Sequence, residues 1–190
     1  MIPQLWVFAG PNGAGKSTLV TQRVAGRLPM VNPDEIAQGL PLRTGQLDVL
    51  AAGRVALMQR EAHLAARRSF GIETTLTGRS ELELMRRAQS VGYKVNLVFI
   101  GVRSAQLSAS RVHLRVRSGG HAVPFADLLR RFQRSLDHLA IALAIADRAF
   151  VLDNSGRRRR FLLSREQGQT RYLAQALPAW AVGAIPPELR

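Results

Sequence analysis

The stretch that decides the fold of this 190-residue chain is Gly10-Pro11-Asn12-Gly13-Ala14-Gly15-Lys16-Ser17-Thr18. Its spacing is G-x-x-x-x-G-K-[ST]. The apolar run at residues 5–9 comes directly before it and is typical of a buried parallel strand, and residues 17–24 have the pattern of a helix. A strand, a glycine-rich loop and a helix in this order form the context that a phosphate-binding loop requires.

The chemistry of the loop follows from its residue types. Gly10, Gly13 and Gly15 allow the backbone to curl, so that successive N–H groups point inward at phosphate oxygens. The start of the following helix adds the positive end of its dipole. Lys16 is placed to neutralise the β and γ oxygens, and the Ser17 hydroxyl to bind Mg²⁺. Residues 10–18 therefore predict a site for ATP with Mg²⁺.

Composition limits the remaining possibilities. A length of 190 residues, with 46% hydrophobic and 21% charged residues, predicts one folded domain over residues 1–190. Cysteine is absent, so there is neither a disulfide framework nor a thiolate zinc site. The first residues lack the charged region of a secretory signal, and no apolar run reaches the roughly 18 residues that span a bilayer. We therefore expect a cytoplasmic protein without a membrane partner.

The formal net charge of +14 has two interpretations. It indicates either a polyanionic partner, such as a nucleic acid or a nucleotide, or an arginine-rich composition spread over the surface. Only two of the 27 basic residues are lysines, Lys16 and Lys94. The basic run at residues 157–160 follows a turn signal, and it is interpreted as a solvated hairpin rather than a nucleic-acid anchor.

Strand and helix patterns alternate along the whole chain. Strands are predicted at residues 5–9, 28–32, 70–75, 93–102 and 149–153, with a C-terminal edge strand at 160–164. Helices are predicted at 17–24, 48–68, 80–88, 104–117 and 124–145; the third has Ser80 as its N-cap, and the second repeats Leu50, Leu57 and Leu64 on one side. This alternation predicts a three-layer αβα P-loop fold with a mostly parallel sheet. A helical lid occupies about 103–134, and a tail occupies 156–190.

Two carboxylates are candidates for chemistry, and one of them, Asp34, is expected at the carboxyl edge of the sheet, where open α/β folds bind ligands. Asp34 follows the second strand and is predicted to accept a proton from a substrate hydroxyl, although a helix N-cap also fits it. Glu73 lies inside a strand-like segment, so it either pairs with an arginine or points into the cleft toward substrate. Asp153 ends an apolar strand, but a turn and basic residues follow, so it is interpreted as structural.

The predicted lid is rich in arginine. Arg111 and Arg115 are four residues apart and project from the same face of a helix. Gly119 and Gly120 then break the helix before His121. Like charges on one face repel each other unless an anion lies between them, and phosphoryl transfer needs such cations around the γ-phosphate. We therefore predict a catalytic role for Arg111 and Arg115. His121 is predicted to contact either the substrate or the glycine hinge.

This sequence resembles the zeta-toxin family of P-loop kinases, in its short bacterial branch. The matching segments are residues 10–18, Asn32-Pro33-Asp34-Glu35, Phe70-Gly71-Ile72-Glu73-Thr74-Thr75-Leu76, Arg111-Val112 through Arg115-Val116, Gly119-Gly120-His121-Ala122-Val123-Pro124 and Asp153-Asn154-Ser155-Gly156. They fall in order over roughly residues 4–156. The first segment is common to many folds, whereas the whole set is specific.

This resemblance implies a kinase that moves the γ-phosphate of ATP to a hydroxyl of a UDP-activated sugar such as UDP-N-acetylglucosamine. It implies that Asp34 is the catalytic base, that Asn32, Glu73, Thr74 and His121 hold substrate, and that Asn154 contacts the nucleotide. It also implies a possible antitoxin protein as partner, with toxicity and acceptor left open. Two alternatives stay open: a nucleic-acid-associated ATPase, disfavoured by an aromatic content of 6%, and a regulatory nucleotide binder without turnover.

Overall fold

The structure is a computed structural model that describes residues 2–42, 48–117 and 124–190. Within these ranges a seven-stranded sheet has the order β2-β3-β1-β4-β5-β6-β7. The strands are β1 (Gln4–Ala9), β2 (Met30–Val31), β3 (Phe70–Thr74), β4 (Lys94–Gly101), β5 (Arg148–Asp153), β6 (Arg160–Glu166) and β7 (Gln169–Leu173). The five strands from β2 to β5 are parallel, and β6 and β7 are antiparallel additions, so the prediction of a mostly parallel sheet is confirmed.

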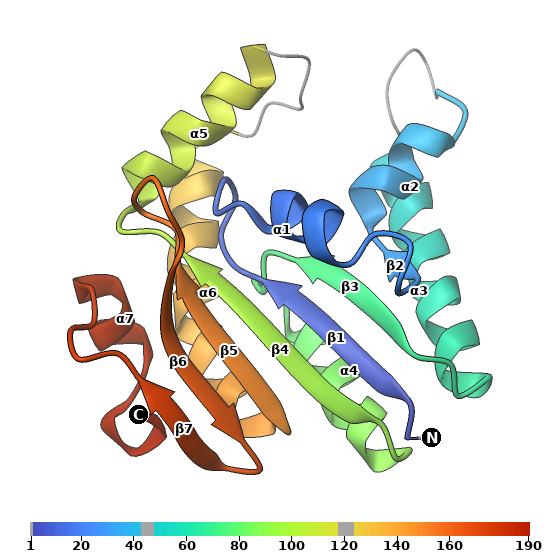
Figure 1. The fold of residues 1–190 in the computed structure, drawn as a ribbon. Coiled ribbons are helices and arrows are strands. Elements are labelled where there is room, and N and C mark those ends of the chain that lie inside the picture. Colours follow the sequence, from blue (N-terminus) through green and yellow to red (C-terminus); the bar gives the residue numbers. More distant parts are fainter. Residues whose placement is uncertain (1, 43–47, 118–123) are drawn as a thin grey trace.

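Helices cover both faces of this sheet (Figure 1). They are α1 (Lys16–Arg23), α2 (Pro33–Gly39), α3 (Val49–Ala65), α4 (Arg79–Ser90), α5 (Ala105–Arg117), α6 (Phe125–Ile145) and α7 (Ala179–Ala184), followed by a 3-10 turn, η1 (Pro187–Leu189). In Figure 1, α4 and α6 lie behind the sheet and α1 lies in front of it. The predicted three-layer α/β architecture is therefore confirmed. None of the helices among the described residues is long and apolar enough to span a bilayer.

Because side chains alternate along each strand, the sheet has one core on each face, and the two cores differ in size. Leu5, Val7, Leu97 and Phe99 belong to a large buried cluster that also contains residues of α4, α6 and α7. A small separate cluster contains Phe8, Val20 and Val98, beneath α1. The large cluster anchors the central strands, and their carboxyl ends meet at the edge where α1 begins.

The structure shows which face of α3 is buried and corrects the predicted start of α4. On α3 the row Ala52, Ala56, Arg60 and Leu64 is buried, whereas Leu50 is 78% exposed and Leu57 53% exposed. Small alanine side chains let α3 approach its neighbours closely, so size decides which face is buried rather than the spacing of leucines. The helix predicted at 80–88 begins at Arg79 with Gly78 as its N-cap, because Ser80 already lies in the first turn.

The C-terminal tail also differs from its prediction. The strand expected at the edge is β6, which pairs with β5 on one side and β7 on the other. The edge is β7, whose five residues are all exposed and therefore lack the alternation that identifies a strand. The basic run at residues 157–160 lies in the connection between the antiparallel strands β5 and β6, and in the first residue of β6, as expected of a hairpin.

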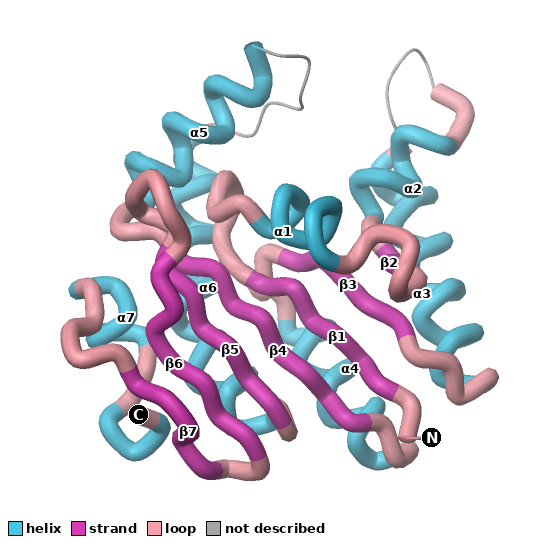
Figure 2. Tube along the Cα trace, viewed as in Figure 1, coloured by secondary structure: helices cyan, strands magenta, loops and turns pink. Residues whose placement is uncertain are grey.

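The predicted lid region contains α5 and the first part of α6. Residues 118–123 lie outside the described residues, and the predicted positions Gly119, Gly120 and His121 fall among them. Figure 2 shows the loops after β1, β4 and β5 gathered at one edge of the sheet, below α5. This edge holds the candidate active site.

Candidate active site

The phosphate-binding loop connects β1 to α1 as the sequence predicts. Gly10 and Gly15 adopt φ values of +139° and +92°, which residues with a Cβ rarely adopt. A Cβ on Gly10 would lie 2.1 Å from the Ile100 carbonyl oxygen, and one on Gly15 would lie 2.6 Å from Asn154 Nδ2. The glycines therefore serve both the curl of the loop and its close contact with β4 and the loop after β5.

Lys16 is buried, with an exposed fraction of 7%. Its Nζ donates hydrogen bonds to the carbonyl oxygens of Gly10 at 2.8 Å and Pro11 at 3.1 Å, so the side chain folds back over the loop. Burial lowers the pKa of Lys16 to about 8, with Glu73 and Asp34 opposing the shift and Arg115 adding to it. An arriving phosphate supplies the counter-charge that this ammonium lacks.

Ser17 and Glu73 meet although 56 positions separate them in the chain. Ser17 Oγ donates to Glu73 Oε1 at 2.7 Å, and Asn32 Nδ2 lies 3.5 Å from Glu73 Oε2. The contact exists because β3 lies between β1 and β2 in the sheet, which places the end of β3 beside the loop. Glu73 thus points into the cleft, and none of the described arginines forms an ion pair with it.

This pair suits a magnesium ion. A serine hydroxyl and a carboxylate oxygen are hard oxygen ligands, and Mg²⁺ typically takes one or two such protein ligands together with phosphate oxygens and water. Among the described residues no cluster of three or more acidic, histidine or cysteine side chains forms a dedicated metal cage. The residues present therefore fit a magnesium that arrives with a nucleotide rather than one held by protein alone.

Asp34 lies in the first turn of α2 and lines the same cavity as Lys16. The N-cap of this helix is Asn32, whose Oδ1 accepts the Asp34 N–H at 3.0 Å. The alternative interpretation of Asp34 as the N-cap is therefore wrong. Because Asn32 caps the helix, the Asp34 carboxylate is not used for capping. None of the described residues donates a hydrogen bond to that carboxylate, so it is available to a ligand.

The end of β3 adds two threonines to the cavity, Thr74 and Thr75. Thr74 Oγ1 accepts the N–H of Leu76 at 2.9 Å, and Leu76 adopts a left-handed φ of +56°. The Leu76 carbonyl oxygen in turn lies 3.0 Å from His138 Nδ1 on α6. Thr74 therefore stabilises a tight turn, and its hydroxyl proton remains free for a ligand.

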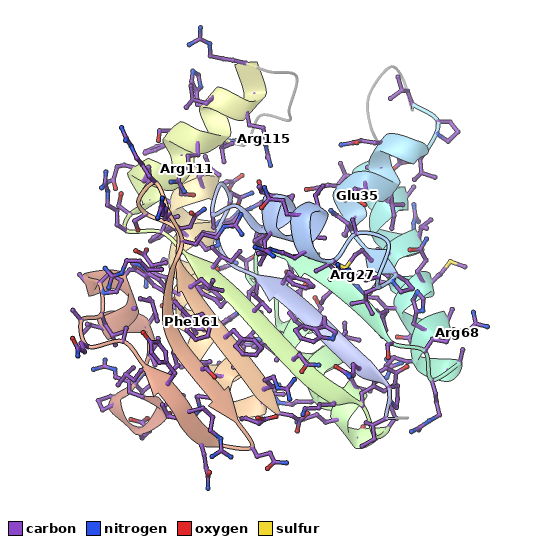
Figure 3. All side chains as sticks on the ribbon, in the orientation of Figure 1. Arg27, Glu35, Arg68, Arg111, Arg115 and Phe161 are labelled. Carbon is purple, nitrogen blue, oxygen red and sulfur yellow. The ribbon has the colours of Figure 1, made fainter. Side chains whose placement is uncertain are left out.

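Arg111 and Asn154 connect the lid region to the loop. Asn154 Nδ2 donates to the Ala14 carbonyl oxygen at 2.8 Å, and Arg111 Nη1 donates to the Asn154 carbonyl oxygen at 2.8 Å. Arg115, one turn further along α5, is exposed and lines the cavity. Figure 3 labels both arginines on α5, on the opposite side of α1 from α2. The pair shares one side of α5, but Arg111 is tethered while Arg115 is free to contact a ligand.

Together these side chains line a cavity of about 490 Å³. Five of the residues that line it were not among the predicted site residues: Pro33, Arg60, Thr75, Glu81 and Arg131. Arg60 lies on the alanine row of α3, which the structure shows to be the buried face, and it interrupts that face with a charge. Asp153 does not line this cavity; its Oδ1 accepts hydrogen bonds from Ser155 Oγ and from Trp180 Nε1 at 3.0 Å, which is a structural role.

The fold and the loop define this protein as one with the fold of zeta-toxin-like P-loop kinases, so the resemblance drawn from the sequence is confirmed for the fold. Residues 5–139 match the family model described as "AAA domain". Because the match covers well over half of the chain, the chain belongs to this family. An uncharacterized protein of Haemophilus influenzae is 31% identical over 127 residues, which are 63% of this chain and 91% of that protein.

Solved structures extend the comparison. The AvrRxo1-ORF1:AvrRxo1-ORF2 complex with sulphate ions has a TM-score of 0.72 and 16% identity, covering 92% of this chain and 62% of that one. The same complex has been solved with ATP, with a TM-score of 0.71, 16% identity and coverage of 89% and 60%. A structure from the PezAT toxin–antitoxin system of Streptococcus pneumoniae has a TM-score of 0.60 at 19% identity, covering 80% and 68%. The chain thus spans about 60% of the length of the first of these neighbours.

Proposed function

We propose that this protein is an ATP-dependent kinase that transfers the γ-phosphate to a hydroxyl group of a small molecule. The observation that carries the proposal is that one cavity brings together Lys16, the Ser17–Glu73 pair and the Asp34 carboxylate, which has no partner among the described residues. These are the parts that phosphoryl transfer requires: a phosphate cradle, ligands for magnesium and a base. The fold shared with a structure that contains ATP supports the same assignment.

The proposed reaction has a simple balance. The acceptor hydroxyl oxygen attacks the γ-phosphorus, the bond from that phosphorus to the bridging oxygen of ADP breaks, and ADP leaves. The proton of the hydroxyl passes to the Asp34 carboxylate. Magnesium, when bound through Ser17 and Glu73, would neutralise charge on the phosphate oxygens. Lys16 and Arg115 stabilise the negative charge of the transferring group, and Arg111 holds α5 in place through Asn154.

A sugar nucleotide such as UDP-N-acetylglucosamine is the acceptor we propose, following the motif resemblance at Asn32, Glu73 and Thr74. All three residues lie at the cavity, on the side of β2 and β3.

An antitoxin protein is the partner we propose, because one structural neighbour comes from a toxin–antitoxin system. The test of the partner is whether growth arrest on expression is relieved by a protein encoded beside this one.

The acceptor is tested by incubating the protein with ATP, Mg²⁺ and a panel of UDP-sugars, nucleosides and small metabolites, and detecting the phosphorylated product by mass. Asp34→Asn is expected to lower turnover by about 10²–10⁴-fold while nucleotide affinity is kept, because only the proton acceptor is lost. Glu83→Gln, at an exposed position of α4 outside the cavity, is the matched control. Turnover of Asp34→Asn at the wild-type rate would contradict the assignment of the base.

The two alternative functions predict different results. A nucleic-acid-associated ATPase would hydrolyse ATP faster when RNA or DNA is added, with polymer affinity falling steeply as salt rises. A regulatory nucleotide binder would bind ATP without turnover of any acceptor. Either pattern, obtained with a protein that binds ATP normally, would replace the kinase proposal.

A further inference from the structure

Arg60 is a buried cation without a partner in the part of the chain that the structure describes. Its exposed fraction is 6%, and its Nε is buried without a hydrogen-bond partner. No described carboxylate forms an ion pair with it. A charged group that is mostly buried without a counter-charge is costly, so an arginine in this position is a poor structural element.

The surroundings of Arg60 do not repair this cost. Glu81 is the carboxylate whose charge acts on Arg60, but its Oε2 accepts a hydrogen bond from Ser80 rather than from Arg60. Burial lowers the pKa of Arg60 below its usual value, and Glu81 offsets the shift only in part. The guanidinium nevertheless lines the active-site cavity together with Thr75, Glu81 and Glu73.

The position of Arg60 separates it from the other cations of the cavity. Arg111 and Arg115 come from α5 and Arg131 from α6, the helices of the predicted lid. Arg60 comes from α3, which packs against α2 and β2, and it lines the same cavity as Asp34 and Glu73. Figure 1 shows α3 and α5 on opposite sides of α1. Arg60 is therefore placed on the side that the proposed reaction assigns to the acceptor.

We infer that Arg60 binds an anionic group of the acceptor, so the natural acceptor carries a phosphate or a carboxylate. This inference rests on the proposed function. A guanidinium presents a planar fork of N–H donors that matches either group with two parallel hydrogen bonds. The anion would complete the missing pairing of Arg60 and would orient the acceptor hydroxyl toward Asp34. A neutral acceptor would leave the buried charge unpaired, so the site discriminates against it.

The test uses matched pairs of neutral and anionic compounds. The wild-type protein is saturated with Mg²⁺ and a non-hydrolysable ATP analogue, which occupies the phosphate loop, and titrated with uridine against UDP and with glucose against glucuronate. The first pair tests a phosphate and the second a carboxylate. Arg60→Gln is expected to weaken binding of the preferred anion at least about tenfold, with Arg60→Lys intermediate, because lysine keeps the charge but loses the fork.

Arg54→Gln is the control, since Arg54 is exposed on the same helix and does not line the cavity; its anion affinity should equal that of the wild type. Thermal unfolding of the ligand-free proteins gives an independent readout. If Arg60 only stabilised the fold by pairing with Glu81, Arg60→Gln would lower the Tm and leave anion binding unchanged. Removing an unpaired buried charge is instead expected to leave the Tm equal or higher.

The outcomes separate this inference from the proposed function. Anion binding that depends on Arg60, without phosphorylation of any acceptor, would support the anion site and contradict the kinase proposal. Phosphorylation of a neutral acceptor at equal rates by the wild type and Arg60→Gln would support the kinase and overturn the inference. Failure of the wild-type complex to bind any of the anions would also overturn it.

Discussion

The buried ammonium of Lys16 makes one prediction that separates stability from function. Lys16→Met replaces the charged side chain by a neutral one of similar length in the ligand-free protein. Burial brings the pKa of Lys16 from 10.5 to about 8, which corresponds to a cost of about 3 kcal/mol for keeping the charge. We therefore expect Lys16→Met to raise the free energy of unfolding at pH 7 by up to about 3 kcal/mol, although it removes the residue that binds phosphate.

The pH dependence of this gain has a definite sign. The folded pKa is below the unfolded value, so between pH 8 and 10.5 the unfolded chain binds the proton that the folded wild type has released. Wild-type stability gains a contribution that rises with pH over this window. The advantage of Lys16→Met is complete below pH 8 and disappears by about pH 10.5.

Urea unfolding of the ligand-free proteins at pH 7 and pH 10 measures this effect. Lys94→Met is the control, since Lys94 is the other lysine of the chain and pairs with Glu166 at 3.2 Å; its loss is expected to cost at most about 1 kcal/mol. Adding ATP and Mg²⁺ should reverse the order at pH 7, because only the wild type binds the ligand tightly. A ligand-free Lys16→Met less stable than the wild type at pH 7 would refute the reasoning.

Three further substitutions test the geometry of the site. Gly15→Ala places a Cβ 2.6 Å from Asn154 Nδ2 at a φ of +92°; we expect a loss of about 1–3 kcal/mol in urea unfolding and weaker ATP binding by calorimetry. Gly101→Ala places a Cβ 2.3 Å from the ring of buried Trp180; we expect a loss of about 1–3 kcal/mol and a red shift of tryptophan fluorescence as the ring moves, and an unchanged spectrum would contradict this packing. Glu73→Gln removes a carboxylate from Ser17 and should raise the Mg²⁺ concentration needed for half-maximal turnover, whereas Asp34→Asn should leave that concentration unchanged.

Features of the fold that depend on residues close together in the sequence can be predicted from it. The phosphate loop is one of these, because its glycines, its lysine and the flanking strand and helix lie within about 20 positions of one another. The parallel sheet is another, since strands that alternate with helices have few other arrangements. Asp34 is predicted at the carboxyl edge of the sheet, and Glu73 either paired with an arginine or pointing into the cleft; the structure places both at the cavity beside the loop.

The order of the strands in the sheet cannot be predicted from local sequence patterns. In the chain β2 follows β1, whereas in the sheet β3 lies between them, so the contact of Ser17 on α1 with Glu73 on β3 joins two elements far apart in sequence. Arg60 escaped prediction for a similar reason. Its burial depends on which face of α3 packs against the rest of the protein, and the large side chains Leu50, Leu57 and Met58 lie exposed on the same helix.

The same strand order gives the two carboxylates different positions relative to the nucleotide. Glu73 lies near the end of β3, the strand next to β1, and accepts a hydrogen bond from Ser17 at the start of α1, so its negative charge is placed at the expected site of the metal. Asp34 follows the strand one place further out, and α2 starts with Asn32 rather than Asp34 as its cap, so within the described residues the Asp34 carboxylate has no partner. An acceptor that reaches Asp34 must therefore extend beyond Glu73 toward α2 and α3, and Arg60 is the cation that it meets there.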